Sequence, residues 1–139
     1  MFAGRVATLH PELCYGPPAG PAGILPAEMA AQLKANGTAA AQHRPSDLLW
    51  FKSQVEDHGP WDYKRYDPAF ENFGNYNYGY TGTRQGISPW LLQGMAGMAG
   101  MVQLKDGTSK WSYRASNFDD PRDQEQISRG IHDALNGCY

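Results

Sequence analysis

The chain has 139 residues, 19% of them charged, and a formal net charge of −2. This length provides one domain with one modest core, and the lack of any apolar run of about 18 residues excludes stable membrane insertion. The small negative net charge does not favour nucleic-acid binding, because proteins that bind along the phosphate backbone are usually basic overall or along one face.

Residues 11–26 contain five of the ten prolines, interleaved with three glycines. Because this composition cannot continue a helix, we expect residues 1–25 to form an arm or linker and residues 26–139 to form a single compact domain. The arm either joins the domain to a longer protein or packs on its own domain.

Two cysteines, Cys14 and Cys138, lie near opposite ends of the chain. Two free thiols are the simpler interpretation. The alternative is one disulfide that ties the ends together, which would suit an oxidising compartment. The cysteine and histidine spacings match no metal-ligand pattern, so we predict neither a metal nor another cofactor.

Helix signals recur along the chain, and they predict an α+β fold that is mainly helical with short β-hairpins. Caps and apolar spacing predict four helices: Pro26–Ala35 before an Asn-Gly stop, Asp47–Asp57 behind Ser46, one that begins at Pro89, and one that begins at Asp120-Pro121 and ends before Gly137. Residues 101–114 are predicted as a hairpin that turns at Asp106-Gly107.

The segment "FENFGNYNYGYTGTRQG", residues 70–86, combines five aromatic rings with three asparagines and four glycines. We expect a glycine-rich hairpin that offers a flat, amphipathic surface for sugar rings. Single-stranded nucleic acid also stacks on rings, but normally within a cationic groove. The third interpretation is a hairpin whose tyrosines pack on the domain. The predicted substrate-binding residues are Trp61, Tyr63, Asn75, Tyr76, Asn77, Tyr78, Tyr80 and Arg84.

Residues 54–67, "QVEDHGPWDYKRYD", hold the candidates for catalysis. Glu56 ends a predicted helix, where the helix dipole and the neighbouring Trp61 would favour its protonated form. A protonated carboxyl group serves as general acid, and Asp62 would be its base or electrostatic partner in a pair that cleaves glycosidic bonds. The alternative is that these charges are simply solvated at a helix end.

Other polar residues support different chemistry. His58 and Lys64, with Arg84 as a further cation, are the candidates for phosphodiester cleavage. Asp119, Asp120 and Asp123 have the pattern of a helix start, and they are secondary candidates for a catalytic carboxylate. The order of a helix ending in Glu, a hairpin and a further helix is similar to the layout of lysozyme-like folds. By this analogy alone, we expect a lysozyme-like layout.

Three stretches together carry a family resemblance: "GPWDYK" (59–64), "FGNYNYGYTG" followed by Gly86 (73–86), and "DDPRDQEQISRGI" (119–131). In this order they resemble the polymorphic toxin type 44 domain over roughly residues 45–135. The resemblance implies a toxin at the end of a larger delivered polypeptide, with a cognate immunity protein. It also implies RNase activity, whereas charge and aromatic content favour a glycan. The positions it marks are Asp62, Lys64, Asn75, Asn77, Tyr78, Gly79, Asp119, Asp120 and Asp123.

The sequence therefore leaves three hypotheses. The first is an antibacterial toxin of interbacterial competition that is delivered into the periplasm of a target cell and cleaves peptidoglycan glycan strands. The second is an RNase toxin that acts in the cytoplasm. The third is a glycan-binding or interaction module without catalysis.

Overall fold

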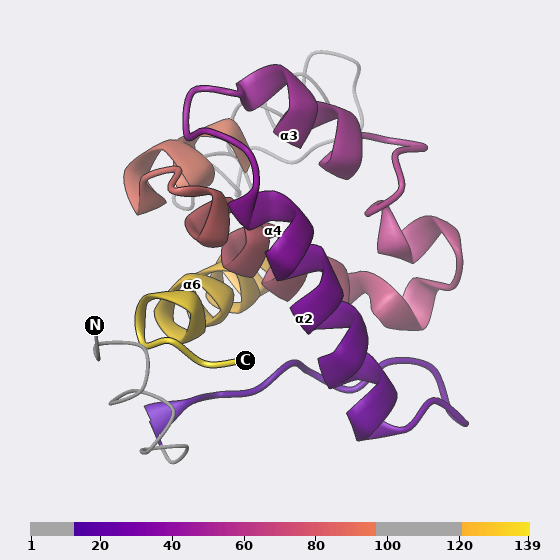
Figure 1. Ribbon diagram of the computed structural model, residues 1–139. Helices are drawn as coiled ribbons and strands as arrows, with labels where there is room; N and C mark the ends of the chain where they lie inside the picture. Colours follow the sequence, from indigo (N-terminus) through magenta and orange to yellow (C-terminus); the bar gives the residue numbers. More distant parts are fainter. Residues whose placement is uncertain (1–12, 97–120) are drawn as a thin grey trace.

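A computed structural model describes residues 13–96 and 121–139 of the chain (Figure 1). The described residues form helices and turns without any strand, so the predicted α+β class is wrong for this part of the protein. The hairpin predicted for residues 101–114 lies outside the described residues.

The elements follow one another along the chain in the order α2 (Pro26–Ala41), α3 (Leu48–Val55), η2 (Tyr63–Arg65), η3 (Pro68–Phe70), α4 (Glu71–Gln85) and α6 (Pro121–Leu135). Residues 89–96 are also helical. The predicted helix starts at Pro26 and Pro121 are confirmed. The second helix is shorter than predicted, and its N-cap is Asp47, whose carboxylate accepts from the backbone N–H of Trp50 at 3.3 Å.

Helix α2 continues through the Asn36-Gly37 pair that was expected to stop it. A Cβ at position 37 would lie 2.6 Å from a ring carbon of Tyr80, so the missing side chain lets α4 approach. Asn36 is buried and donates to the hydroxyl of Tyr63 at 2.7 Å and to the Asn77 side chain at 3.0 Å. These tertiary contacts outweigh the local stop signal.

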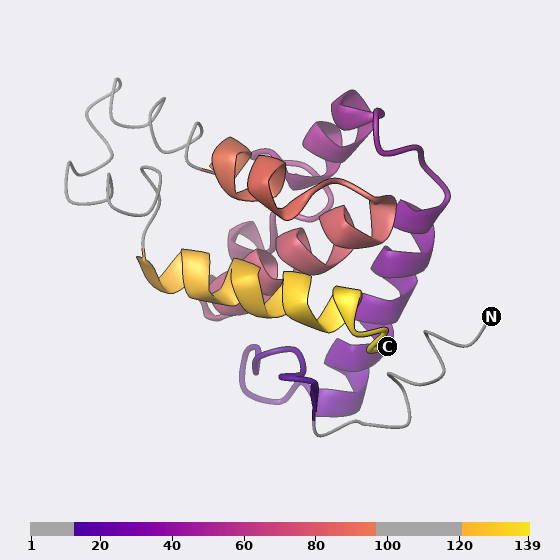
Figure 2. The ribbon, with the colours of Figure 1, turned by 90° about the vertical axis from the view of Figure 1, so that its left-hand side faces the viewer.

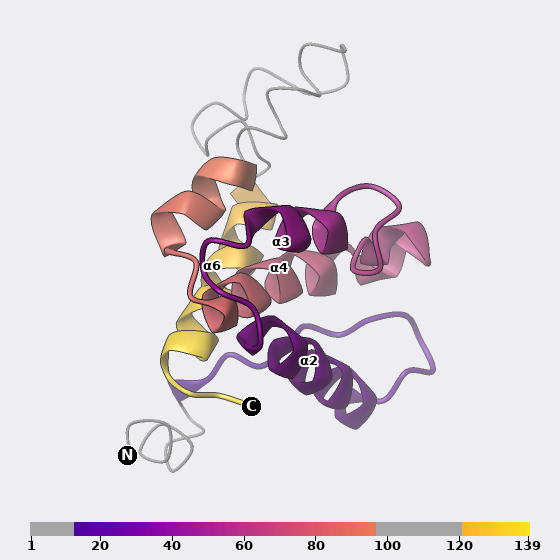
Figure 3. The same ribbon diagram turned by 45° about the horizontal axis from the view of Figure 1, so that its top comes forward.

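Residues 71–85, expected as a hairpin, form the central helix α4, which packs against α2 and α6. Figure 2 shows α6 lying alongside α4, and Figure 3 shows α3 beside α4. Phe73, Tyr76 and Tyr80 are at most 1% exposed and share one core cluster with Leu33 of α2. Their spacing of three and four residues is that of a buried helix face. The lysozyme-like layout, which required a hairpin here, is therefore not present.

Candidate active site

The loop after α3 is held in a fixed shape by its own polar groups. Asp62 accepts a hydrogen bond from the backbone N–H of His58 at 2.9 Å, and the backbone N–H of Trp61 donates to the carbonyl of Gln54 at 2.8 Å. His58 has a φ of 68°, in the left-handed region. Trp61 is buried in the core. The Asp62 carboxylate, with a side chain only 12% exposed, is thus engaged in closing a turn.

The other polar candidates of this loop point to solvent. Glu56 is exposed and its carboxylate pairs with Lys52 Nζ at 2.6 Å. It therefore lacks the apolar surroundings that the sequence predicted for a general acid. His58 and Lys64 are exposed, and Arg84 is exposed in the last turn of α4.

The predicted sugar platform is part of the core instead. Tyr76, Asn77 and Tyr80 are fully buried, so they offer no surface to a substrate. Burial, followed by the hydrogen bond to a neighbouring carboxylate, raises the pKa of Tyr76 above its usual range. Tyr78 is partly buried and donates to the carbonyl of Leu92.

Helices α4 and α6 run parallel, which brings their first turns together. Tyr76 lies against Gly130, and its hydroxyl donates to Asp133 one turn further along α6. Tyr80, one turn further along α4, donates to the carbonyl of Cys138 at 2.8 Å. Residues closer to the C-terminus of α4 thus contact residues closer to the C-terminus of the chain, as in parallel helices. The second and third motifs of the toxin resemblance consequently lie side by side.

Two glycines determine how closely α4 and α6 approach each other. A Cβ at Gly79 would lie 2.1 Å from the carbonyl oxygen of Ile127, and one at Gly130 would lie 2.1 Å from the carbonyl oxygen of Tyr76. Any side chain at either position would collide with backbone, so only glycine allows the helices to approach this closely.

A polar hollow of about 280 Å³ opens where these two first turns meet. We call it the α4–α6 hollow. Its lining residues are Pro68, Ala69, Glu71, Asn72, Arg122 and Asp123. Glu71 and Asp123 are the acidic residues in the first turns of α4 and α6. Glu71 is exposed and Asp123 is half-buried, and acidic side chains in a first turn interact favourably with the helix dipole.

This arrangement combines two carboxyl groups with an amide and a guanidinium around one space. Carboxyl groups can take and give protons or attack a substrate atom. The amide of Asn72 and the guanidinium of Arg122 supply hydrogen-bond donors. Asp123 was a secondary candidate from the sequence, and Asp119 and Asp120 lie outside the described residues. Asn75, one turn further along α4, is half-buried and donates to the carbonyl of Glu71 at 3.2 Å.

Sequence reasoning missed Glu71, Asn72 and Arg122. Glu71 follows a proline and a 3-10 turn and begins a helix, which is a common acidic position. That signal was readable only if residues 71–85 were recognised as helical. Tyr63 packs against Phe73, with ring centroids 4.9 Å apart, on the other side of the same chain segment.

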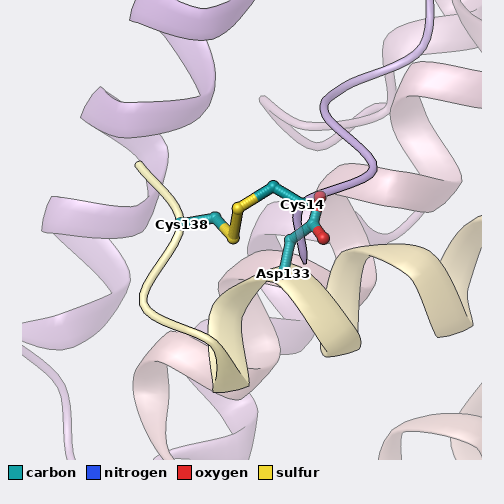
Figure 4. Close-up of side chains that lie close together, drawn as sticks. All are labelled: Cys14, Asp133 and Cys138. Carbon is teal, nitrogen blue, oxygen red and sulfur yellow. A yellow bond between two sulfur atoms is a disulfide. The ribbon is translucent and has the colours of Figure 1, made fainter. Parts of the chain in front are cut away.

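The proline-rich arm meets the C-terminal end of α6, where Cys14 and Cys138 form a disulfide (Figure 4). The favoured interpretation of two free thiols is therefore wrong. Buried Asp133 accepts from the backbone N–H groups of Tyr15 and Gly16 at 2.9 and 2.8 Å, which fastens the arm to α6.

Among the described residues, Cys14, Asp133 and Cys138 are one group whose potential ligand atoms lie within 4.8 Å of one another. Sulfur atoms joined in a disulfide are not the thiolates that bind metals. These residues therefore form a structural junction, in which the carboxylate orders the backbone and the disulfide closes the chain.

Comparisons with known proteins identify the family. No curated protein and no solved structure matched the chain. In the described part of the chain, no helix has the length and apolar character needed to cross a membrane. A family model described as Bacterial toxin 44 matches residues 29–134, which is well over half of the chain and includes all three motifs. The chain therefore belongs to the bacterial toxin 44 family and is a bacterial toxin domain.

Proposed function

We propose that this toxin domain is a hydrolase that cleaves the glycan strands of peptidoglycan, and that its active site is the α4–α6 hollow. The observation that carries the proposal is that Glu71 and Asp123 line one polar hollow at the joined ends of two parallel helices. Glycosidic bonds are cleaved by such pairs, in which one carboxyl group protonates the leaving oxygen and the other activates water or attacks the sugar.

The charges of the hollow favour a neutral sugar over a polyanion. The lining contains two acidic residues and one basic residue, Arg122, and the whole chain has a net charge of −2. Nucleic-acid sites are usually rich in Lys and Arg. The donors of Asn72 and Arg122 would instead hold hydroxyl and carbonyl groups of the glycan.

The disulfide between Cys14 and Cys138 supports action in the periplasm. Disulfides persist in the bacterial periplasm and are rare in the reducing cytosol. In this proposal the toxin reaches the periplasm of a target cell as part of a larger delivered polypeptide, as a weapon of interbacterial competition. A cognate immunity protein protects the producing cell.

An RNase acting in the cytoplasm is the second candidate, and one observation favours it. His132 is 41% exposed, and its Nδ1 lies 3.0 Å from the buried carboxylate of Asp133, an arrangement that orients an imidazole for proton transfer. Lys64 and Arg84 do not lie together as one basic patch. Lys64 follows Tyr63, which contacts Gly74, whereas Arg84 lies ten residues further along α4, or about 15 Å.

The test is toxicity in a bacterial host that expresses the domain either in the cytoplasm or fused to an export signal. We expect killing only after export, with rounding or lysis of the cells. Glu71→Gln and Asp123→Asn should each lower glycan hydrolysis by about 100-fold or more, because each removes a carboxyl group needed for proton transfer. Both variants should remain folded, with a loss of stability of at most about 1 kcal/mol from the missing charge at a helix N-terminus.

Glu56→Gln is the matched control, since Glu56 is an exposed carboxylate outside the lining of the hollow. It should leave toxicity unchanged. Lost toxicity in Glu56→Gln, with both hollow variants active, would place the active site in the loop after α3. Killing from the cytoplasm with RNA degradation, lost in His132→Ala, would establish the RNase. Toxicity that survives every one of these substitutions would favour the non-catalytic module.

A further inference from the structure

A second hollow lies on the other side of the segment that lines the first. It measures about 200 Å³ and is formed between α2 and the start of α4. Its wall consists of the rings of Tyr63, Phe70 and Phe73, whose centroids lie 4.9 to 6.3 Å apart. Its remaining lining includes Ile24, Glu28 and Gln32. We call it the aromatic hollow.

The two hollows are neighbours because one short segment contributes to both. Ala69 and Glu71 line the α4–α6 hollow, whereas Phe70, between them, lines the aromatic hollow. An extended ligand seated in one hollow therefore needs to cross only the segment 69–71 to reach the other.

The aromatic hollow suits a small group that is apolar on one side and polar on the other. Its volume is below the range of about 300–1,000 Å³ typical of sites for whole drug-sized ligands. The rings offer apolar faces. One oxygen of the Glu28 carboxylate accepts from the backbone N–H of Leu25 at 2.9 Å, and the other can accept from a ligand. The amide of Gln32 can both donate and accept. An acetamido group, with one methyl and one amide, combines these needs.

We propose that the aromatic hollow is a substrate-binding subsite that recognises an N-acetylated sugar of the same glycan chain whose bond is cleaved in the α4–α6 hollow. This inference rests on the proposed function and adds its specificity. The methyl of the acetamido group packs on Phe70 and Tyr63, and the amide N–H and carbonyl bind at Glu28 and Gln32. The subsite thereby positions the neighbouring glycosidic bond between the catalytic carboxyl groups.

The rigid wall supports this role. Phe73 is 1% exposed and fixed in the core. The hydroxyl of Tyr63 accepts from buried Asn36 at 2.7 Å, so its ring is held from both sides. The amide of Gln32 donates to the Asn36 side chain at 2.9 Å, which orients it at the rim. A wall whose rotamers are already fixed loses little entropy when a ligand binds.

The test is calorimetric binding of triacetylchitotriose, a trimer of N-acetylglucosamine, to the Glu71→Gln protein, in which the probe is not consumed. Cellotriose, which has a hydroxyl in place of each acetamido group, is the matched probe. We expect triacetylchitotriose to bind at least about tenfold more tightly, a difference of about 1.4 kcal/mol. Adding Phe70→Ala or Gln32→Ala should each weaken its binding about fivefold or more.

Trp90→Ala is the control, because Trp90 is an aromatic side chain that is 82% exposed and lines neither hollow. It should not change binding. Gln32 is exposed, so Gln32→Ala disturbs the fold less than Phe70→Ala and keeps the test valid if Phe70→Ala fails to fold.

Equal binding of both trimers, no binding, or unchanged affinity in Phe70→Ala and Gln32→Ala would overturn the subsite. A failure of the proposed function looks different: selective binding that depends on Phe70 and Gln32 would remain, but the wild-type protein would release no sugar from peptidoglycan.

Discussion

Replacing Gly79 by alanine tests whether the close contact of α4 and α6 organises the fold and the hollow. The new Cβ would lie 2.1 Å from the carbonyl oxygen of Ile127, which is 0.9 Å short of the 3.0 Å below which real Cβ contacts essentially never fall. The obstacle is backbone, so the two helices must separate. Overpacking of this kind costs about 1–3 kcal/mol or more, while alanine gains about 1 kcal/mol in helix propensity. Because the obstacle is rigid backbone, the upper end of that range applies, and we expect a net loss of about 2 kcal/mol.

Gly74→Ala is the matched substitution in the same helix. Its Cβ would meet only the Cβ of Tyr63 at 3.5 Å, an ordinary contact, so this variant should gain up to about 1 kcal/mol. Urea unfolding of both variants, with free energies of unfolding from linear extrapolation, provides the comparison. The proposed hydrolytic activity should also fall in Gly79→Ala, because separation of the helices moves Asp123 away from Glu71. A Gly79→Ala protein as stable and active as Gly74→Ala would refute this reasoning.

Three further predictions concern the junction at the end of α6. A reducing agent should lower the stability by up to about 4–5 kcal/mol, because the disulfide closes a loop of 124 residues; the Cys14→Ser, Cys138→Ser double variant should not respond to the reductant. Asp133→Ala should cost at least about 3 kcal/mol in urea unfolding, because it leaves the Tyr76 hydroxyl and two backbone N–H groups without an acceptor. In alkaline solution, stability should decrease above about pH 10, where the unfolded chain loses tyrosine protons that the folded protein retains.

The sign of the alkaline effect follows from the direction of the pKa shift. Burial first, and then the hydrogen bond to Asp133, raises the pKa of Tyr76 above its unfolded value of about 10. The resulting stability is complete below pH 10 and is lost as the pH rises toward the folded pKa, by up to about 1.4 kcal/mol per pH unit. Tyr76→Phe should reduce this slope in a pH series of thermal melts, and an unchanged slope would contradict the assignment.

The starts of the helices were the most readable feature of the sequence, and α4 was the least. Pro26 and Pro121 begin helices as predicted, because proline at the first position needs no partner for a missing N–H. In α4, tyrosines and glycines suggested strands and turns. The rings at positions 73, 76 and 80 nevertheless follow a helical period, and Gly79 serves a close helix contact that no local rule reveals.

The candidate site could be predicted only in part from the sequence, because α4 was not recognised as a helix. Asp123 was among the predicted residues, but its partner across the hollow, Glu71, could be found only once the first turns of α4 and α6 were placed together. The buried tyrosines explain why the predicted substrate-binding surface was wrong. A segment rich in tyrosine and asparagine can form an exposed binding surface, but it can equally form a buried helix whose hydroxyl groups donate to acceptors inside the core. The disulfide was an open alternative because 124 residues separate the cysteines in sequence.

The most direct test of the central claim measures reducing sugar ends released from purified peptidoglycan sacculi by the oxidised domain. We predict release by the wild-type protein and by Glu56→Gln, and loss of release by about 100-fold or more in both Glu71→Gln and Asp123→Asn, with both variants folded and destabilised by at most about 1 kcal/mol. Wild-type release that persists in both hollow variants, or no release by a folded wild-type protein, would contradict the assignment of the α4–α6 hollow as a glycan-cleaving active site.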